Sequence, residues 1–155
     1  MGQLQIKDRV VLFDDADEEL IRSYRWNLHL TPTVTYARGY PFGQRAGGLT
    51  YMHRLLTKAE RGRDVDHINH DGLDNRRSNL RVCSRSQNIA NRHVAASATG
   101  IKGVHFEAQT GRWRAELAYE GKRYRLGRFD TLQGAADAYN RKALEVCGEF
   151  ANPVG

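Results

Sequence analysis

Apolar and polar positions alternate in short runs over the first sixty residues, and the period of the alternation changes from run to run. A period of two predicts a strand, and a period near 3.6 predicts a helix with one apolar face. Asp15, followed three residues later by Glu18, has the form of a helix capping box. The predicted elements are strands over Arg9–Phe13, Trp26–Leu30 and Val34–Tyr40, helices over Ala16–Tyr24 and Thr50–Ala59, and a hairpin loop over Gly43–Gly48.

The stretch from Val65 to Arg92 is too polar to be mainly a core element. Two short apolar runs, Val65–Ile68 and Leu80–Cys83, predict strands that flank a loop rich in Asp, Asn and Gly. Ser84 followed by Gln87 is a second capping-box pattern, so a helix of about two turns should follow. The predicted order in this stretch is strand, loop, strand and helix.

A weakly patterned segment near residues 94–100 resembles a linker, and the pattern changes beyond it. Three strands joined by short turns are predicted, followed by a helix that is capped by Thr131 and ended by Gly148. The predicted spans are Lys102–Glu107, Trp113–Glu120 and Lys122–Phe129 for the strands and Leu132–Cys147 for the helix. We therefore expect an α+β chain with a domain over 1–93, a linker over 94–100 and a second domain over 101–155.

Charge and composition narrow the partners and the compartment. The 155 residues carry a net charge of +6, which makes nucleic acid the first candidate partner, although an RNA- or ribosome-associated protein would share this trait. Cys83 and Cys147 lie far apart and neither sits in a C-x-x-C pattern, which argues against a zinc knuckle or a disulfide framework. No apolar leader or membrane-length apolar run is visible. We expect a cytoplasmic protein.

The polar side chains of the central stretch suggest hydrolysis assisted by a metal ion. Asp66 offers a carboxylate and Asn88 an amide oxygen, both hard ligands suited to Mg²⁺ or Mn²⁺. The imidazole of His67 has the ordinary pKa of a general base that removes a proton from water. Adjacent residues on a regular strand point to opposite faces, so Asp66 and His67 can serve one site only at a strand end or kink. Arg76 and Arg77 in the following loop could hold the flanking phosphates.

The segment DHINHDGLDNRRSNLRVCSRSQN resembles the HNH nuclease motif of the phage and intron homing-endonuclease branch, with its ββα-metal core. The resemblance rests on the spacing of His67, Asn79 and Asn88. It implies that His67 is the general base, that Asp66 and Asn88 hold one divalent cation, and that Asn79 pins the loop. Bacteriocin-type relatives end in H-x-x-x-H, whereas Asn88 and Arg92 stand at those places here, which favours Mg²⁺ over a two-His zinc site.

Other interpretations of the same residues are weaker. An EF-hand calcium loop aligned on Gly72 would place His67 at position one and Ser78 at position twelve, where Asp and Glu are required. His53 is interpreted as a surface or packing residue of its helix rather than as a ligand, and His70 and His93 have no predicted partner. Asp71 and Asp74 are expected to be turn residues that accept backbone hydrogen bonds.

Alternation along the second C-terminal strand separates an apolar face, which suits the underside of the helix, from a charged face. A charged sheet face can be merely solvated or can enter the major groove of DNA. The segment from Gly100 to about Pro153 resembles the Apetala-two (ethylene-response-factor) DNA-binding domain, in which the exposed face of the sheet reads DNA. The matching positions are Lys102, His105, Arg112, Arg114, Glu116, Arg123 and Arg125.

Together these features predict a homing-type endonuclease that acts on double-stranded DNA in a bacterial host cell. In this hypothesis the C-terminal sheet docks the duplex and the metal-dependent site cuts a phosphodiester. The main alternative is a non-catalytic DNA-binding regulator that keeps a vestigial HNH fold.

Overall fold

The computed structural model describes residues 1–44, 48–92 and 100–153. The chain divides into two compact units, Met1–Ser84 and Arg85–Gly155, and each is described by itself. Residues 45–47 of the expected hairpin loop and residues 94–99 of the expected linker lie outside the described residues. The division of the chain into functional domains stays a prediction, and helix α3 (Arg85–Asn91) groups with the second unit.

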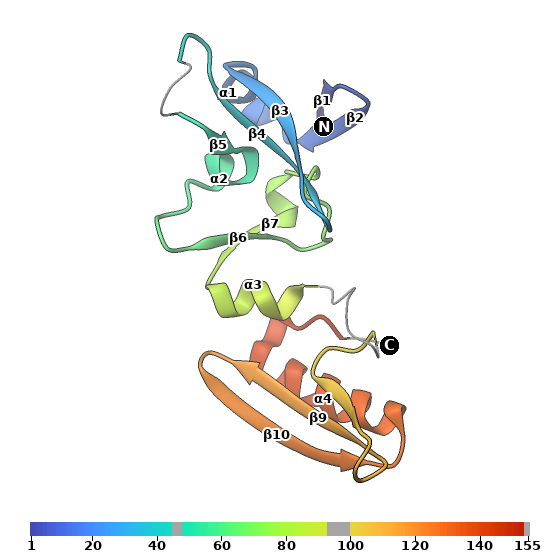
Figure 1. Cartoon of the computed structure of the whole chain (residues 1–155). Helices are drawn as coiled ribbons and strands as arrows, with labels where there is room; N and C mark the ends of the chain where they lie inside the picture. Colours follow the sequence, from blue (N-terminus) through green and yellow to red (C-terminus); the bar gives the residue numbers. More distant parts are fainter. Residues whose placement is uncertain (45–47, 93–99, 154–155) are drawn as a thin grey trace. The chain divides into compact units, whose positions relative to one another are not determined.

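The first unit contains three small antiparallel sheets and short helices, which confirms a mixed class of helices and strands (Figure 1). Its sheets pair β1 with β2, β3 with β4 and β5, and β6 with β7. The strands are β1 (Gly2–Ile6), β2 (Arg9–Phe13), β3 (Tyr24–Leu30), β4 (Thr35–Pro41), β5 (Thr50–Tyr51), β6 (Asp64–His67) and β7 (Leu80–Cys83). The helical segments are η1 (Asp15–Asp17), α1 (Glu18–Arg22), α2 (Met52–Thr57) and η2 (Arg77–Asn79).

Two predicted helices of this unit are shorter than expected, and one strand was not predicted. The region predicted as a helix over Ala16–Tyr24 is a 3₁₀ turn followed by the five-residue α1, and the Asp at its start makes no capping hydrogen bond. Helices this short are not stable alone and depend on packing. Strand β1 was not predicted from the sequence. Its Gly2 packs so closely on the Phe13 ring that any side chain there would overlap the ring.

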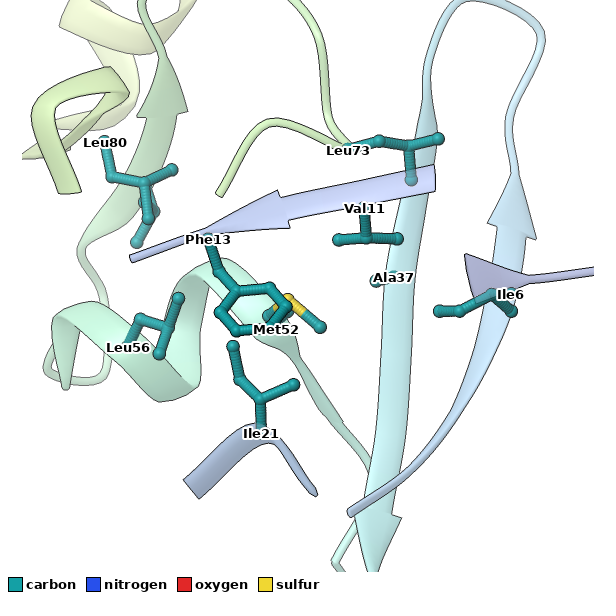
Figure 2. Packing of buried hydrophobic residues seen from close by; sticks show 10 residues of the cluster. Ile6, Val11, Phe13, Ile21, Ala37, Met52, Leu56, Leu73 and Leu80 are labelled. Carbon is teal, nitrogen blue, oxygen red and sulfur yellow. The ribbon is translucent and has the colours of Figure 1, made fainter. Parts of the chain in front are cut away.

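One apolar cluster holds the first unit together (Figure 2). Val11 and Phe13 from β2 pack among Ile21 of α1 and Met52 and Leu56 of α2. All five side chains are almost completely inaccessible to solvent. The same cluster includes Val65 of β6 and Leu80 of β7, so it packs the short elements of the first sixty residues against the strands that follow them.

The N-terminal hairpin is also joined to the loop between β6 and β7. The Leu12 amide donates to the Leu73 carbonyl (2.9 Å), and the Asn75 amide donates to the Leu12 carbonyl (2.8 Å). Farther along the loop, the Arg77 amide donates to Asp14 Oδ2 (2.8 Å), and the Arg77 guanidinium pairs with the buried Asp17 carboxylate (2.7 Å). The loop is therefore positioned by residues about sixty places earlier in the chain.

The second unit pairs a three-stranded antiparallel sheet, in the order β10–β9–β8, with a long helix. Its elements after α3 are β8 (Val104–Glu107), β9 (Arg112–Tyr119), β10 (Lys122–Phe129), α4 (Leu132–Cys147) and η3 (Gly148–Phe150). Alternation on β9 places Ala115, Leu117 and Tyr119 in the buried set, and Trp113 on the same predicted face is half-buried. Thr131 Oγ1 accepts the Gly134 amide and caps α4. Glu120 and Gly121 both have positive φ, which suits a tight hairpin turn.

No helix among the described residues is long and apolar enough to cross a membrane.

Gly72 provides a test of the packing between the loop and β4. A Cβ atom at Gly72 would overlap the Thr35 carbonyl oxygen and approach the Tyr36 ring and the Val34 side chain within 2.7 Å. Because backbone atoms cannot yield cheaply, Gly72→Ala should destabilise the first unit by about 1–3 kcal/mol. Urea unfolding followed by Trp26 fluorescence in a Trp113→Phe background measures this, with Gly134→Ala in the second unit as the control. An unchanged unfolding midpoint for Gly72→Ala would contradict the tight contact.

Candidate active site

His67 is the last residue of β6, and both it and Asp66 are buried. The His70 amide donates to the His67 carbonyl (3.0 Å), so a turn begins as soon as the strand ends. Asp66 faces Arg81 across the hairpin and His67 faces Leu80. The structure thus places the Asp–His pair at a strand end, the condition under which neighbouring residues can serve one site.

Asp66 is held by an ion pair inside the β6–β7 hairpin. Arg81 Nε and Nη2 lie 2.8 and 2.7 Å from Asp66 Oδ2. The Arg81 side chain is only 12% exposed and the Asp66 side chain 7%, so the two groups compensate each other's charge away from water. Arg81 was not among the residues singled out from the sequence. The cross-strand register, which the sequence does not display, is what brings it to Asp66.

The imidazole of His67 is surrounded by rings and by one buried amide. Its Nε2 lies 3.5 Å from Asn75 Oδ1, and its ring centroid lies 5.8 Å from that of Tyr36 and 5.0 Å from that of His53. Burial lowers the pKa of His67, and the Asn75 hydrogen bond and nearby carboxylates offset the shift only in part. The imidazole is therefore uncharged at neutral pH, the state in which it can accept a proton.

His53 lies beside His67, which sequence interpretation did not foresee. It sits on α2, is 9% exposed, packs edge-on against His67 at an interplanar angle of 84° and stacks on Tyr51. Tyr51 Oη in turn lies 2.9 Å from His29 Nδ1. Within the described residues, His53 Nδ1 has no hydrogen-bond partner. Burial, together with the nearby His67 and Arg54, lowers the pKa of His53 to about 3.

Asn79 makes hydrogen bonds that close the loop on itself. Its Oδ1 accepts the Asn69 amide (3.0 Å), while its Nδ2 donates to Asn69 Oδ1 (2.9 Å) and to the Asp74 carbonyl (2.8 Å). The side chain is buried, so these bonds satisfy polar groups that water does not reach. This arrangement suits the loop-pinning role that the resemblance implies for Asn79.

The acids of the loop serve as turn residues and as partners of its two arginines. Asp71 Oδ1 accepts the Leu73 amide (2.9 Å). Arg76 grips Asp74 through Nη2–Oδ2 (2.6 Å) and Nε–Oδ1 (2.8 Å), and these contacts lower the pKa of Asp74. Arg77 is paired with Asp17. Both arginines therefore already bind carboxylates, and any contact with phosphate would have to share or replace those partners.

Asn88, the second predicted metal ligand, lies half-buried on α3 of the second unit. Among the residues that the structure describes, no three His, Cys, Asp or Glu side chains gather as metal ligands. The Asp66 carboxylate and the Asn88 amide belong to different units, and both are oxygen donors of the kind that suits Mg²⁺ or Mn²⁺, so their joint role as ligands stays a prediction. Cys83 is no candidate thiolate ligand, since burial raises its pKa to about 11.

The predicted DNA-reading residues fall into three groups on the C-terminal unit. Lys102 Nζ donates to the carbonyls of Ile89 and Ala90, so it caps α3 and is not directed to an open face. Arg112 pairs with Asp130, and Arg114 lies near Glu107 and Glu116. His105, Arg123 and Arg125 are exposed, and no ion pair of Arg123 or Arg125 is found among the described residues.

A second cationic sheet face lies in the first unit and was not foreseen. Cross-strand neighbours on β3 and β4 are Arg25 with Tyr40, and Asn27 with Arg38. The same alternation continues to His29 opposite Tyr36, the residue whose ring contacts His67. This face carries arginine and aromatic side chains and no acid at these paired positions, a composition compatible with a polyanion.

Comparison with known proteins identifies the segment that contains these residues. The HNH endonuclease family matches residues 50–90, the segment from β5 to α3 that contains Asp66, His67 and Asn79. Protein 3.8 of Escherichia phage T7 is 32% identical over 92 residues, which cover 59% of the chain and 75% of the phage protein. Residues 50–90 of the chain thus form an HNH endonuclease domain.

Two further relatives extend the comparison beyond the matched segment. A protein of Acanthamoeba polyphaga mimivirus, described as the uncharacterized HNH endonuclease L560, is 27% identical over 139 residues, covering 86% of the chain and 68% of the viral protein. The rice APETALA2-like protein 2 is 45% identical over 47 residues, which are 30% of the chain and 11% of the plant protein. No solved structure matches the chain.

The buried His53 predicts how stability depends on pH. The pKa of His53 is about 3 in the folded chain and 6.5 in the unfolded chain, where burial and the neighbouring charges are lost. The unfolded chain therefore binds more protons than the folded chain between pH 3 and 6.5. Stability contributed by neutral His53 is present above pH 6.5 and is lost as the pH falls. Between pH 6.5 and 5 the loss should be about 2 kcal/mol.

His53→Phe keeps a ring at this place and should remove that part of the acid sensitivity. Urea unfolding of the first unit, measured through Trp26 at pH 7.5, 6 and 5, checks the expectation. His105→Ala, on an exposed position of β8, serves as the control. Equal pH dependence in His53→Phe and the unsubstituted chain would show that His53 is not buried in its neutral form.

Proposed function

We propose that the chain is a DNA endonuclease of the homing type that hydrolyses phosphodiester bonds with His67 as general base. The observation that carries the proposal is the uncharged, buried His67 at the end of β6, beside Asp66 and inside the segment matched by the HNH family. A neutral imidazole next to a hard-oxygen ligand is the combination that metal-assisted hydrolysis of phosphodiesters requires.

The protein groups would divide the work as follows. His67 accepts the proton of the attacking water, and the Asn79 hydrogen bonds keep the loop behind it in place. Asp66, oriented by Arg81, and Asn88 would hold a single Mg²⁺ or Mn²⁺. HNH nucleases generally use a divalent metal, and when bound it stabilises charge that develops on the phosphate and the leaving oxygen.

The C-terminal unit is proposed as the part that docks double-stranded DNA. A partial likeness to the plant APETALA2-like protein, over 30% of the chain, supports this proposal. The three-stranded sheet with a helix on one face also has the form expected for an Apetala-two-like domain. Arg123 and Arg125 on β10 and His105 on β8 are its exposed candidate contacts. Arg112, Arg114 and Glu116 would join them after exchanging partners. The substrate would be DNA in the cytoplasm of a bacterial host.

Replacing the general base should separate cleavage from binding. His67→Ala removes the proton acceptor, which contributes roughly 10²–10⁴-fold to such reactions, and should reduce cleavage by at least that factor. DNA affinity should stay within about threefold, because the cationic surfaces are untouched. Nicking of supercoiled phage or host DNA with Mg²⁺, and gel-shift binding in chelator, measure the two properties.

Controls in the same assay decide between the proposal and a vestigial nuclease. The unsubstituted chain should cleave with Mg²⁺ or Mn²⁺ and stop cleaving when a chelator is added. Binding without any metal-dependent cleavage would instead support a non-catalytic DNA-binding regulator. Preference for RNA over duplex DNA in competition would contradict both.

The exposed arginines of β10 should set the salt dependence of binding. Arg123→Ala and Arg125→Ala should each lower affinity and reduce the slope of log K against log salt by about 1 for each lost phosphate contact. Arg141→Ala, an exposed arginine of α4, is the matched control and should leave the slope unchanged. Equal slopes for all three variants would remove β10 from the interface.

A further inference from the structure

Asn75 is a fully buried polar residue of the β6–β7 loop. The function proposed above gives this residue no role. None of its surface reaches solvent, and its backbone amide donates to the Leu12 carbonyl (2.8 Å). The residue is therefore anchored to the N-terminal hairpin rather than to the catalytic strand. Its side chain reaches back to His67, with Asn75 Oδ1 at 3.5 Å from His67 Nε2.

The second hydrogen bond of the amide decides which of its atoms faces His67. Asn75 Nδ2 lies 3.4 Å from the Gly72 carbonyl oxygen, which can only accept, so the nitrogen must be on that side. The oxygen then faces His67. A carbonyl-type oxygen is an acceptor only, so the His67 Nε2 that meets it must carry the proton.

We propose that Asn75 is a positioning residue of the catalytic centre: its side-chain oxygen accepts the His67 Nε2 proton and thereby assigns His67 Nδ1 as the nitrogen that takes the proton from water. The inference rests on the role of His67 as general base. A neutral imidazole has one protonated and one bare nitrogen, and the hydrogen bond of one determines the task of the other. Loss of the acceptor at Asn75 would remove this preference for a proton on Nε2.

Neighbouring rings keep the imidazole in the orientation that this hydrogen bond selects. Tyr36 and His53 lie against His67 at ring centroid distances of 5.8 and 5.0 Å, the latter nearly perpendicular. Rotation of the His67 ring would require these packed side chains to move. The amide and the rings thus act together, the first on the tautomer and the second on the ring plane.

Two substitutions separate the acceptor role from a purely structural one. Asn75→Leu has the same branched skeleton of heavy atoms but neither accepts from His67 nor donates to Gly72. Asn75→Asp also loses the donor to Gly72 but keeps an oxygen toward His67. A structural role through Gly72 would be damaged equally by both, whereas the proposed role is lost only in Asn75→Leu.

We expect Asn75→Leu to lower kcat for DNA cleavage by about two- to tenfold, because His67 Nδ1 would then be bare in only part of the molecules, with KM within about threefold, and Asn75→Asp to keep kcat above that of Asn75→Leu. Val11→Ala, which opens a cavity in the core beside Leu12, is the control for lost stability and should cleave normally at temperatures where it is folded. Equal losses in both Asn75 variants would overturn the proposal.

The tautomer can be observed without cleavage, which separates failure of this inference from failure of the proposed function. In protein labelled with ¹⁵N-histidine, the His67 signals are assigned by their loss in His67→Ala. The unsubstituted chain should show His67 protonated at Nε2, and Asn75→Leu should show a mixture of tautomers. A proton on Nδ1 in the unsubstituted chain would overturn the assignment whether or not the chain cuts DNA, and absence of cleavage with the expected tautomer would reject only the nuclease function.

Discussion

The attachment of the β6–β7 loop to the N-terminal hairpin is the constraint on which the candidate site depends. A loop made largely of Asp, Asn, Gly and Arg has too few apolar side chains to fix itself by burial. It is held by hydrogen bonds to Leu12, by the bond from Arg77 to Asp14 and by internal amide contacts of Asn79. Without the N-terminal hairpin, the loop beside His67 would lose the hydrogen bonds to Leu12 and Asp14 that position it.

Elements from the first sixty residues therefore help to build the candidate site. Tyr36 on β4 and His53 on α2 bring rings to His67, while Leu12 on β2 places Asn75. A ββα segment alone would keep Asp66 and His67 but expose the imidazole to water. The lowered pKa of His67 follows first from its burial, so these outer elements contribute to its charge state as well as to its position.

Local pattern was sufficient for some elements of the fold and insufficient for others. Strands β2, β7 and β10 and helix α4 have the predicted bounds, because alternation, a Thr cap and a terminal Gly are all read within a few residues. Helices α1 and α2 came out shorter, and β1 was missed, because their bounds depend on packing against the core. Motif spacing singled out Asp66, His67 and Asn79, whose roles stay a prediction.

Contacts between residues far apart in the sequence could not be predicted from the sequence. Arg81 meets Asp66 through strand register, Asn75 meets His67 across the loop, and His53 arrives from a separate helix. Arg76 and Arg77 were expected to bind phosphate on the basis of charge alone. The structure shows carboxylate partners for both, one of which, Asp17, lies sixty residues away in the chain. The expected phosphate contacts stay a prediction.

The pairing of acids with arginines has a consequence for how a polyanion meets this centre. Asp66, Asp74 and Asp17 are each buried, and each is matched by one guanidinium, from Arg81, Arg76 and Arg77 respectively. From a distance, a paired carboxylate and guanidinium act as a dipole, and the field of a dipole decreases with distance faster than that of a single charge. The carboxylates needed to hold the loop therefore create no long-range barrier to the phosphate backbone. Asn75, an uncharged amide, orients His67 without adding another negative charge where the substrate must arrive.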